Sequence, residues 1–195
     1  MTPGAVAGDA VEARSSALIV IDGINGFYDP SGPTYYPEVE QTIEPIVTLL
    51  AAARARERLV VHAVERHREV LDDFEWRVLP PHFMHGSFDA EIFPRFAPTH
   101  AREIVVPKRR FSAFFATDLA LLLREHGIGS VVLAGCKTNV CIRATAQDAF
   151  ANGFSVIVVR EATNSNRPHL AEASLEDIER YMGRVVSLDE AASLL

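Results

Sequence analysis

Residues 130–152 read SVVLAGCKTNVCIRATAQDAFAN, and the interpretation of the whole chain starts from this stretch. The apolar run at residues 131–134 predicts a buried strand, which Gly135 ends. Alanine and aromatic side chains recur at helical spacing from Ala144 onward, so a helix should follow a short loop. The pattern therefore predicts a strand–loop–helix unit with Cys141 where the helix begins.

The position of Cys141 points to a chemical role. The first N–H groups of a helix lack partners, and this end of a helix carries partial positive charge. A thiol there is shifted toward the thiolate, which is the nucleophilic form, and loop N–H groups beside it could hold an oxyanion. Free cysteines are also common as small buried side chains, so the position alone leaves a structural role open.

Composition bounds the class of protein. The chain has 195 residues, of which 48% are hydrophobic and 23% are charged, as expected for one soluble domain. A net charge of −7 argues against general nucleic-acid binding. No apolar stretch is long enough for a membrane span, and no secretory signal begins the chain. A disulfide between Cys136 and Cys141 would close too small a loop to add much, so we expect a cytoplasmic location.

Predicted strands and helices alternate along the chain. Apolar runs predict strands at residues 17–21, 59–64, 104–106, 131–134, 154–159 and 184–187. Periodic segments predict helices that begin between 38 and 42 and end near 58, then at 119–126, from 140 onward and at 174–181. This order predicts a single α/β domain over residues 17–195, with three α/β/α layers and a mainly parallel sheet of about six strands. Residues 1–16 should form a flexible N-terminal segment.

Three polar residues are expected at one edge of this sheet. Asp22 ends the first predicted strand, Lys108 follows the third, and Cys141 follows the central one. Ligand sites in open parallel sheets lie outside the carboxyl ends of the strands. There, Lys108 would lower the pKa of the thiol, and Asp22 could pass its proton to a leaving amine. Taken singly, Asp22 could be a turn residue and Lys108 a surface lysine.

Three segments together resemble the isochorismatase-like cysteine hydrolases, and the resemblance runs from Leu18 to about Glu190. The segments are ALIVIDGINGFYDP at 17–30, VVPKRRFSAFFATDLALLLREHGI at 105–128 and VVLAGCKTNVCIRATAQDAFANGFSVIVV at 131–159. The resemblance implies that Cys141 is the nucleophile, Asp22 the general base and acid, and Lys108 the group that stabilises the thiolate.

The same resemblance implies an oxyanion hole and a reaction. A cis peptide is expected between Cys136 and Lys137, with the N–H groups of Lys137 and Cys141 holding the oxyanion. Some members that bear the isochorismatase name lack the nucleophilic cysteine, which this chain has. We therefore expect amide hydrolysis of a small molecule through a thioester, releasing ammonia or an amine. Nicotinamide and ureido or carbamoyl compounds are possible substrates. Vinyl-ether hydrolysis of the isochorismate type, and a non-catalytic binding subunit, remain alternatives.

A metal site is a further implication. Nicotinamidases of the family bind a metal through an Asp-x-His at a strand end and a later Pro-Pro-His. This chain has Glu65-x-His67 and a Pro-Pro-His that ends at His82, and Glu75 resembles an extra glutamate of some nicotinamidases. Glu65 replaces the usual aspartate. The set suits Zn²⁺, Mn²⁺ or Fe²⁺, although the triad requires no cofactor, and a polar loop without metal is the alternative.

The expected walls of the substrate pocket are aromatic, with one amide. They are Phe27, Trp76, Phe83, Phe114 and Asn139. Asn139 stands where nicotinamidases commonly have aspartate, and Lys137 adds a charge where a small or apolar residue is more usual. Both features argue against nicotinamide as the substrate. Because family members are commonly oligomers, the resemblance also implies a homo-oligomer.

Overall fold

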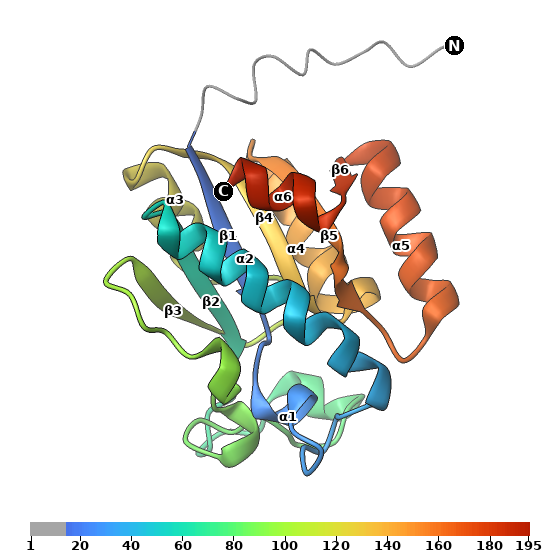
Figure 1. Ribbon diagram of the computed structural model, residues 1–195. Coiled ribbons are helices and arrows are strands. Elements are labelled where there is room, and N and C mark those ends of the chain that lie inside the picture. The colour runs from blue at the N-terminus through green and yellow to red at the C-terminus, as the bar shows by residue number, and fades with distance from the viewer. Residues whose placement is uncertain (1–14) are drawn as a thin grey trace.

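The computed structural model describes residues 15–195, in which six strands form one parallel sheet of order β3-β2-β1-β4-β5-β6. The strands are β1 (Ser15–Ile21), β2 (Leu59–Glu65), β3 (Glu103–Lys108), β4 (Ile128–Cys136), β5 (Ser155–Asn164) and β6 (Gly183–Val186). Helices cover both faces of the sheet (Figure 1), which confirms the predicted three-layer α/β/α fold. In the described residues no helix has the length and apolarity that a membrane span requires.

Each face of the sheet has its own set of helices. Helices α2 (Ile43–Ala55) and α6 (Leu188–Leu194) cover the face nearer the viewer in Figure 1. Helices α3 (Leu119–Glu125), α4 (Arg143–Ala151) and α5 (Pro168–Tyr181) cover the other. The short helix α1 (Asn25–Tyr28) lies beyond the carboxyl end of β1. Successive side chains of a strand alternate between faces, so buried strands without polar alternation, as in β1, require both layers of helices.

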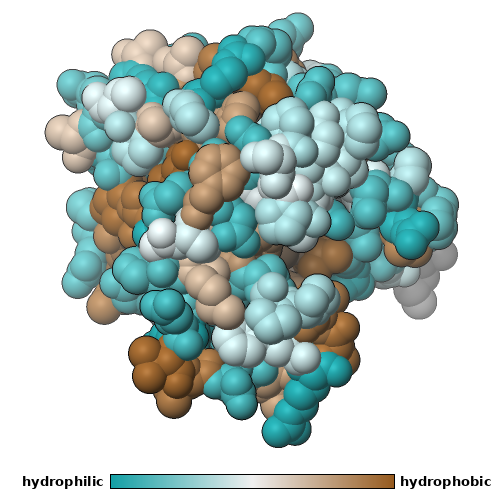
Figure 2. Space-filling model, turned by 90° about the horizontal axis from the view of Figure 1, so that it is seen from below, coloured by the Kyte–Doolittle hydropathy of each residue, from teal (hydrophilic) through white to brown (hydrophobic). Residues whose placement is uncertain are grey.

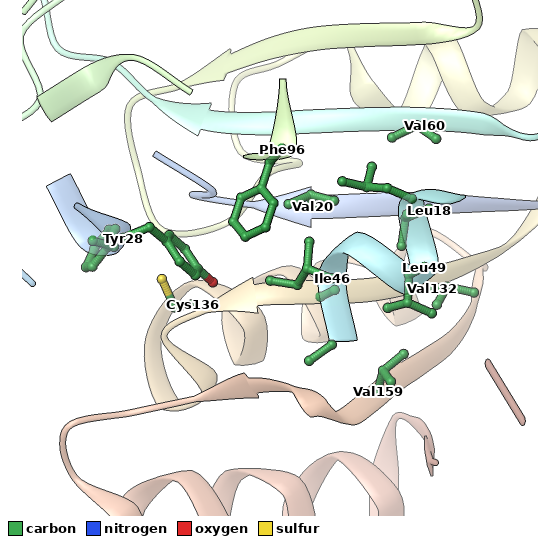
Figure 3. Close-up of a cluster of buried hydrophobic side chains, with 14 of the residues drawn as sticks. Leu18, Val20, Tyr28, Ile46, Leu49, Val60, Phe96, Val132, Cys136 and Val159 are labelled. Atoms are coloured by element: carbon green, nitrogen blue, oxygen red, sulfur yellow. The ribbon is translucent and has the colours of Figure 1, made fainter. Parts of the chain in front are cut away.

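The two cores show this alternation directly. Leu18 and Val20 of β1 pack toward α2 with Ile46, whereas Ile19 packs toward the opposite helices. Figure 3 shows the first of these cores, where the side chains of α2 lie over the strands. Burying each such side chain contributes roughly 1.5–3 kcal/mol. These contacts fix the sheet that positions the polar residues at its carboxyl edge.

The order of the strands creates a crevice between β1 and β4. From β1 the chain proceeds to β2 and β3 on one side, and from β4 it proceeds to β5 and β6 on the other. Where strand order reverses in this way, the connections leave the sheet in opposite directions and open a site at the carboxyl ends. Asp22 follows β1 and Cys141 follows β4, so both lie at this crevice.

The structure moves the start of the predicted domain and places its last residue in the core. The segment predicted to be flexible, 1–16, overlaps β1, because Ser15 and Ser16 already pair with β4; residues 1–14 lie outside the described residues. At the other end, Leu195 is fully buried against α2 and β1 of its own chain.

Two predicted helices also have different boundaries. The helix expected between 38 and 58 consists of a 3-10 turn, Pro37–Thr42, and then α2. It ends before residue 58 because Glu57 has a positive φ of 54°, which breaks helical geometry. Helix α5 begins at Pro168 rather than at Ser174, which lies inside the helix and donates to the carbonyl of Leu170. Proline suits the first turn because no helical partner is needed there.

Candidate active site

Three different elements deliver the nucleophilic cluster. Asp22 is the first residue after β1, and Lys108 is the last residue of β3 rather than the residue after it. Cys141 lies in a π-helical turn, Thr138–Ile142, which runs directly into α4. The sequence placed Cys141 at a helix start, and the extra turn is the detail it missed. All three side chains are buried, with Cys141 4% exposed.

The ammonium of Lys108 joins the other two groups. Its Nζ lies 2.8 Å from Oδ2 of Asp22 and 3.7 Å from Sγ of Cys141. It also lies 3.1 Å from Oε2 of Glu65 and donates to the carbonyl oxygen of Arg110. The structure therefore brings together the acid, base and thiol that the sequence predicted, and adds Glu65 as a second carboxylate beside the lysine.

The backbone holds Asp22 in a fixed orientation. Its φ of 51° is left-handed, a region that aspartate enters more readily than most residues. Its N–H donates to the carbonyl of Ala63 at 2.8 Å, and its Oδ1 accepts from the N–H of Glu65 at 2.8 Å. Gly135 of β4 has a φ of 115°, and a Cβ there would lie 2.0 Å from the carbonyl oxygen of Ile21. Only glycine allows β4 to approach so closely to the residue preceding Asp22.

Burial and charge set the protonation of the thiol and the lysine. Burial raises the pKa of Cys141 well above its ordinary value, although the charge of Lys108 lowers it. Burial alone would lower the pKa of Lys108, but the charges of Asp22, Cys141 and Glu65 raise it well above its ordinary value. Burial therefore favours the thiol form of Cys141, and the neighbouring charges favour the ammonium form of Lys108.

The pKa values of the two carboxyl groups beside Lys108 are shifted in opposite directions. Complete burial raises the pKa of Asp22 despite the charge of Lys108. Burial also opposes the ionisation of Glu65, but Lys108 and hydrogen bonds from two histidines hold its pKa well below its ordinary value. Pairs of groups whose environments separate their pKa values in this way are suited to different tasks. Asp22 is suited to accept a proton, whereas Glu65 stays ionised.

Glu65 also belongs to a second cluster, formed by the four predicted metal ligands. One ligand atom from each of Glu65, His67, Glu75 and His82 lies within 4.8 Å of the others. Oε1 of Glu65 is 3.0 Å from Nε2 of His67 and 3.1 Å from Nε2 of His82. Both oxygens of Glu75 are buried and have no hydrogen-bond partner. Burial raises the pKa of Glu75, and the charge of Glu65 raises it further.

Outer contacts orient the two histidines toward this cluster. Nδ1 of His67 lies 3.1 Å from Oδ2 of Asp73, and Nδ1 of His82 lies 2.6 Å from the carbonyl oxygen of Pro80. Each ring therefore has its Nε2 directed at Glu65. Asp73, in turn, is 2.7 Å from the guanidinium of Arg110. Sequence reasoning missed Asp73, although an aspartate just before a short helical turn is a typical capping residue.

The loop before Cys141 has the geometry that the resemblance implies. The peptide bond between Cys136 and Lys137 is cis. The carbonyl oxygen of Lys137 accepts from the N–H groups of Val140 and Ile142, which closes the loop into the π-helical turn. Asn139 lines a surface cavity of about 420 Å³, and its Oδ1 is buried without a partner.

The predicted pocket walls separate into two groups. Phe27 and Phe83 pack on each other with ring centroids 5.2 Å apart. Phe83 also contacts the ring of His82, and Trp76 that of His67, so these aromatic side chains surround the second cluster. Phe114 instead stacks on Phe154 in the core on the α4 side of the sheet. Its ring packs in the same cluster as Cys141, and a pocket wall at Phe114 stays a prediction.

Figure 2 shows the face of the molecule beyond the carboxyl ends of the strands. Hydrophilic surface dominates it, with several separate apolar patches. The segment after β2 contributes exposed apolar side chains, among them Val70 at 89% and Val78 at 81%. Cys141 is almost inaccessible, with 4% of its surface exposed.

Two sequence comparisons with known proteins match nearly the whole chain. A sequence model described as Isochorismatase domain matches residues 16–190. Maleamate amidohydrolase from Pseudomonas putida is 38% identical over 201 residues, which cover 93% of this chain and 87% of the relative. The similarity therefore spans every residue of both clusters.

Solved structures are also similar to this chain over most of its length. An isochorismatase-like hydrolase from Alkaliphilus metalliredigens has a TM-score of 0.86 and 36% identity, covering 92% of this chain and 98% of that one. A pyrazinamidase of Pyrococcus horikoshii in complex with zinc has a TM-score of 0.80 and 28% identity, covering 89% of this chain and 99% of that one. The similarity to these structures thus includes a protein that binds zinc.

Proposed function

This chain belongs to the isochorismatase family, and we propose that it is a cysteine hydrolase that cleaves the C–N bond of a small-molecule amide. The observation that carries the proposal is the position of Lys108, whose ammonium contacts the carboxylate of Asp22 and the sulfur of Cys141 in a buried site. The name of the Pseudomonas putida relative, an amidohydrolase, supports the same reaction class.

The first half of the reaction transfers an acyl group to sulfur. Asp22 takes the thiol proton of Cys141 as the sulfur attacks the amide carbonyl carbon, and Lys108 stabilises the developing thiolate. The N–H groups of Lys137 and Cys141 would hold the oxyanion of the tetrahedral intermediate. Asp22 then returns the proton to the leaving nitrogen, the C–N bond breaks, and ammonia or an amine departs. The raised pKa of Asp22 suits both transfers.

The second half restores the free enzyme. Asp22, ionised again, takes a proton from a water molecule that attacks the thioester carbonyl. Collapse of the new tetrahedral intermediate breaks the C–S bond and releases a carboxylic acid. The sulfur leaves as a thiolate that recovers its proton from Asp22, while Lys108 keeps its charge throughout.

The second cluster fits a divalent metal ion. Two imidazole nitrogens and two carboxylates form a donor set that suits Zn²⁺, Mn²⁺ or Fe²⁺. The oxygens of Glu75 support this assignment, because they are buried and accept no hydrogen bond, with Nε2 of His82 and Nη1 of Arg110 no nearer than 3.7 and 3.9 Å. Asp73 and the carbonyl of Pro80 already orient His67 and His82, as outer contacts of metal ligands do. When bound, the ion would supply a Lewis acid beside the substrate pocket.

The proposal is tested by measuring ammonia release from purified protein. The panel contains maleamate, nicotinamide and an N-carbamoyl amino acid, whose hydrolysis is followed as ammonia release, and a vinyl ether, whose loss is followed by chromatography. Each compound is assayed with and without added Zn²⁺. Cys141→Ala is the matched variant, and thermal unfolding checks that its fold is intact. We expect ammonia from at least one amide and none from the variant. Release that survives in Cys141→Ala would contradict the nucleophile, and turnover of the vinyl ether alone would favour the other reaction.

The homo-oligomer implied by the family resemblance stays a prediction. Size-exclusion chromatography with light scattering tests it directly, and a monomer at assay concentrations would contradict it.

A further inference from the structure

Lys137 carries a positive charge that the reaction described above does not use. Its side chain is half-buried in the loop that precedes Cys141. Its Nζ lies 5.8 Å from the ring centroid of Phe27 and 5.4 Å from that of Tyr36. Within residues 15–195, Lys108 forms ion pairs with two carboxylates, whereas Lys137 forms none. The ammonium therefore faces two aromatic rings and no described anion.

Aromatic rings attract an ammonium group but do not accept its hydrogen bonds fully. A cation over a ring gains about 0.5–2 kcal/mol, but its N–H groups still lack acceptors. Nearby polar groups are used elsewhere, since the hydroxyl of Tyr36 donates to Oδ1 of Asn164 at 2.7 Å. Glu38, whose charge acts on Tyr36, is exposed and makes no ion pair with Lys137. A half-buried lysine in these surroundings would bind an anion well.

The location identifies which anion. The backbone of Lys137 adjoins the nucleophile loop, and Phe27 belongs to the segment that follows Asp22. We propose that Lys137 binds a carboxylate of the substrate, so that the enzyme selects small amides that carry a negative charge. This inference rests on the proposed function and names its substrate class. A half-amide of a short dicarboxylic acid fits, because one end carries the amide and the other the charge.

The reach of the side chain limits the length of such a substrate. A lysine has a flexible four-carbon stem, so its ammonium reaches roughly 6 Å from its own backbone. The oxyanion would lie at that same backbone, and the carboxylate would lie beside the ammonium. The two ends of the substrate are then separated by only a few carbon atoms. The substrate in the name of the Pseudomonas putida relative, maleamate, is a four-carbon half-amide of this kind.

The first test uses two alkylating reagents of the same shape and different charge. Iodoacetate is an anion and iodoacetamide is neutral, and both alkylate thiolates, so the rate of modification is followed at Cys141. We compare wild type with Lys137→Met, which keeps the apolar stem against Phe27 and Tyr36. The ratio of the two alkylation rates, iodoacetate over iodoacetamide, should fall roughly tenfold in the variant. Lys137→Arg keeps the charge and should restore most of the ratio, which a purely structural role would not do.

The second test uses turnover. The quantity measured is kcat/KM for a half-amide divided by kcat/KM for the corresponding neutral diamide. Loss of a buried ion pair to the substrate predicts that this ratio falls roughly 30- to 1000-fold in Lys137→Met. An unchanged alkylation ratio together with an unchanged turnover ratio would overturn the inference. If wild type hydrolyses no amide, the proposed function fails, and the alkylation ratio alone then decides whether Lys137 selects anions.

Discussion

Removal of the Lys108 charge should destabilise the fold as well as stop the reaction. Lys108→Met retains most of the volume of the side chain but leaves the carboxylates of Asp22 and Glu65 without their cation. Both carboxylates are buried, with exposed side-chain fractions of 0% and 3%. Breaking a buried ion pair by removing one partner costs about 3–5 kcal/mol. We expect a loss of this size from the free energy of unfolding at pH 7, measured by urea denaturation.

The dependence of this loss on pH follows from the sign of the pKa shifts. Without Lys108, burial would raise the pKa of both carboxyl groups in the folded variant above their values in the unfolded chain. Folding is then penalised above the pKa values of the unfolded chain, because the buried groups must take up protons on folding or, above their raised pKa values, remain ionised while buried. The penalty disappears as the pH falls and the groups are protonated in both states. The stability gap between wild type and variant should therefore narrow from pH 8 to pH 5.

A matched control distinguishes this mechanism from a general effect of losing a lysine. Lys137→Met makes the same chemical change a few residues from Cys141, but Lys137 forms no ion pair in the described part of the chain. Its cost should stay below about 1 kcal/mol. If Lys108→Met proves too unstable to purify, the double variant with Glu65→Gln should regain stability, because one unpaired charge is gone. Equal losses in Lys108→Met and Lys137→Met would refute the reasoning.

Two further predictions concern the metal cluster and the edge of the sheet. Zn²⁺ at 100 times its Kd should stabilise wild type by about 2.7 kcal/mol, which is measured as a rise in Tm. His82→Ala should abolish this rise. An equal rise in both proteins would contradict the assigned ligands. Burial opposes ionisation of Glu103, but Arg54 and His62 lower its pKa to about 2 from 4.5. The stability that Glu103 provides is complete above pH 4.5 and is lost toward pH 2, so Glu103→Gln should differ most from wild type at pH 7 in urea unfolding.

The sequence predicted the fold and the meeting of Asp22, Lys108 and Cys141 because both depend on local patterns. Apolar runs bounded by polar residues mark buried strands, and parallel strands bring their carboxyl ends to one edge. Asp22 and Lys108 could be assigned to that edge from the order of the predicted strands alone. The π-helical turn at Cys141 was missed because a single extra residue in a helical turn leaves the spacing of apolar side chains almost unchanged.

The surroundings of the site were harder to predict because they depend on irregular segments. Asp73 contacts His67 across six positions of loop, and no periodicity indicates that approach. Phe114 lies in a segment without regular structure, so its ring could have faced either the pocket or the core. The stacking on Phe154 depends on where α4 ends and β5 begins, which only the folded chain determines.

Glu65 stands where aspartate is usual, and its longer side chain contacts both clusters. One carboxylate oxygen, Oε1, faces His67 and His82, and the other, Oε2, faces Lys108. The additional CH₂ group of glutamate moves the carboxylate by about one C–C bond, roughly 1.5 Å. Because Lys108 also contacts Cys141 and Asp22, the charge of Glu65 acts on both clusters. A cation bound between the histidines would therefore attract the negative charge of Glu65. The attraction between Glu65 and Lys108 would then weaken, which would leave the ammonium freer to stabilise a thiolate at Cys141.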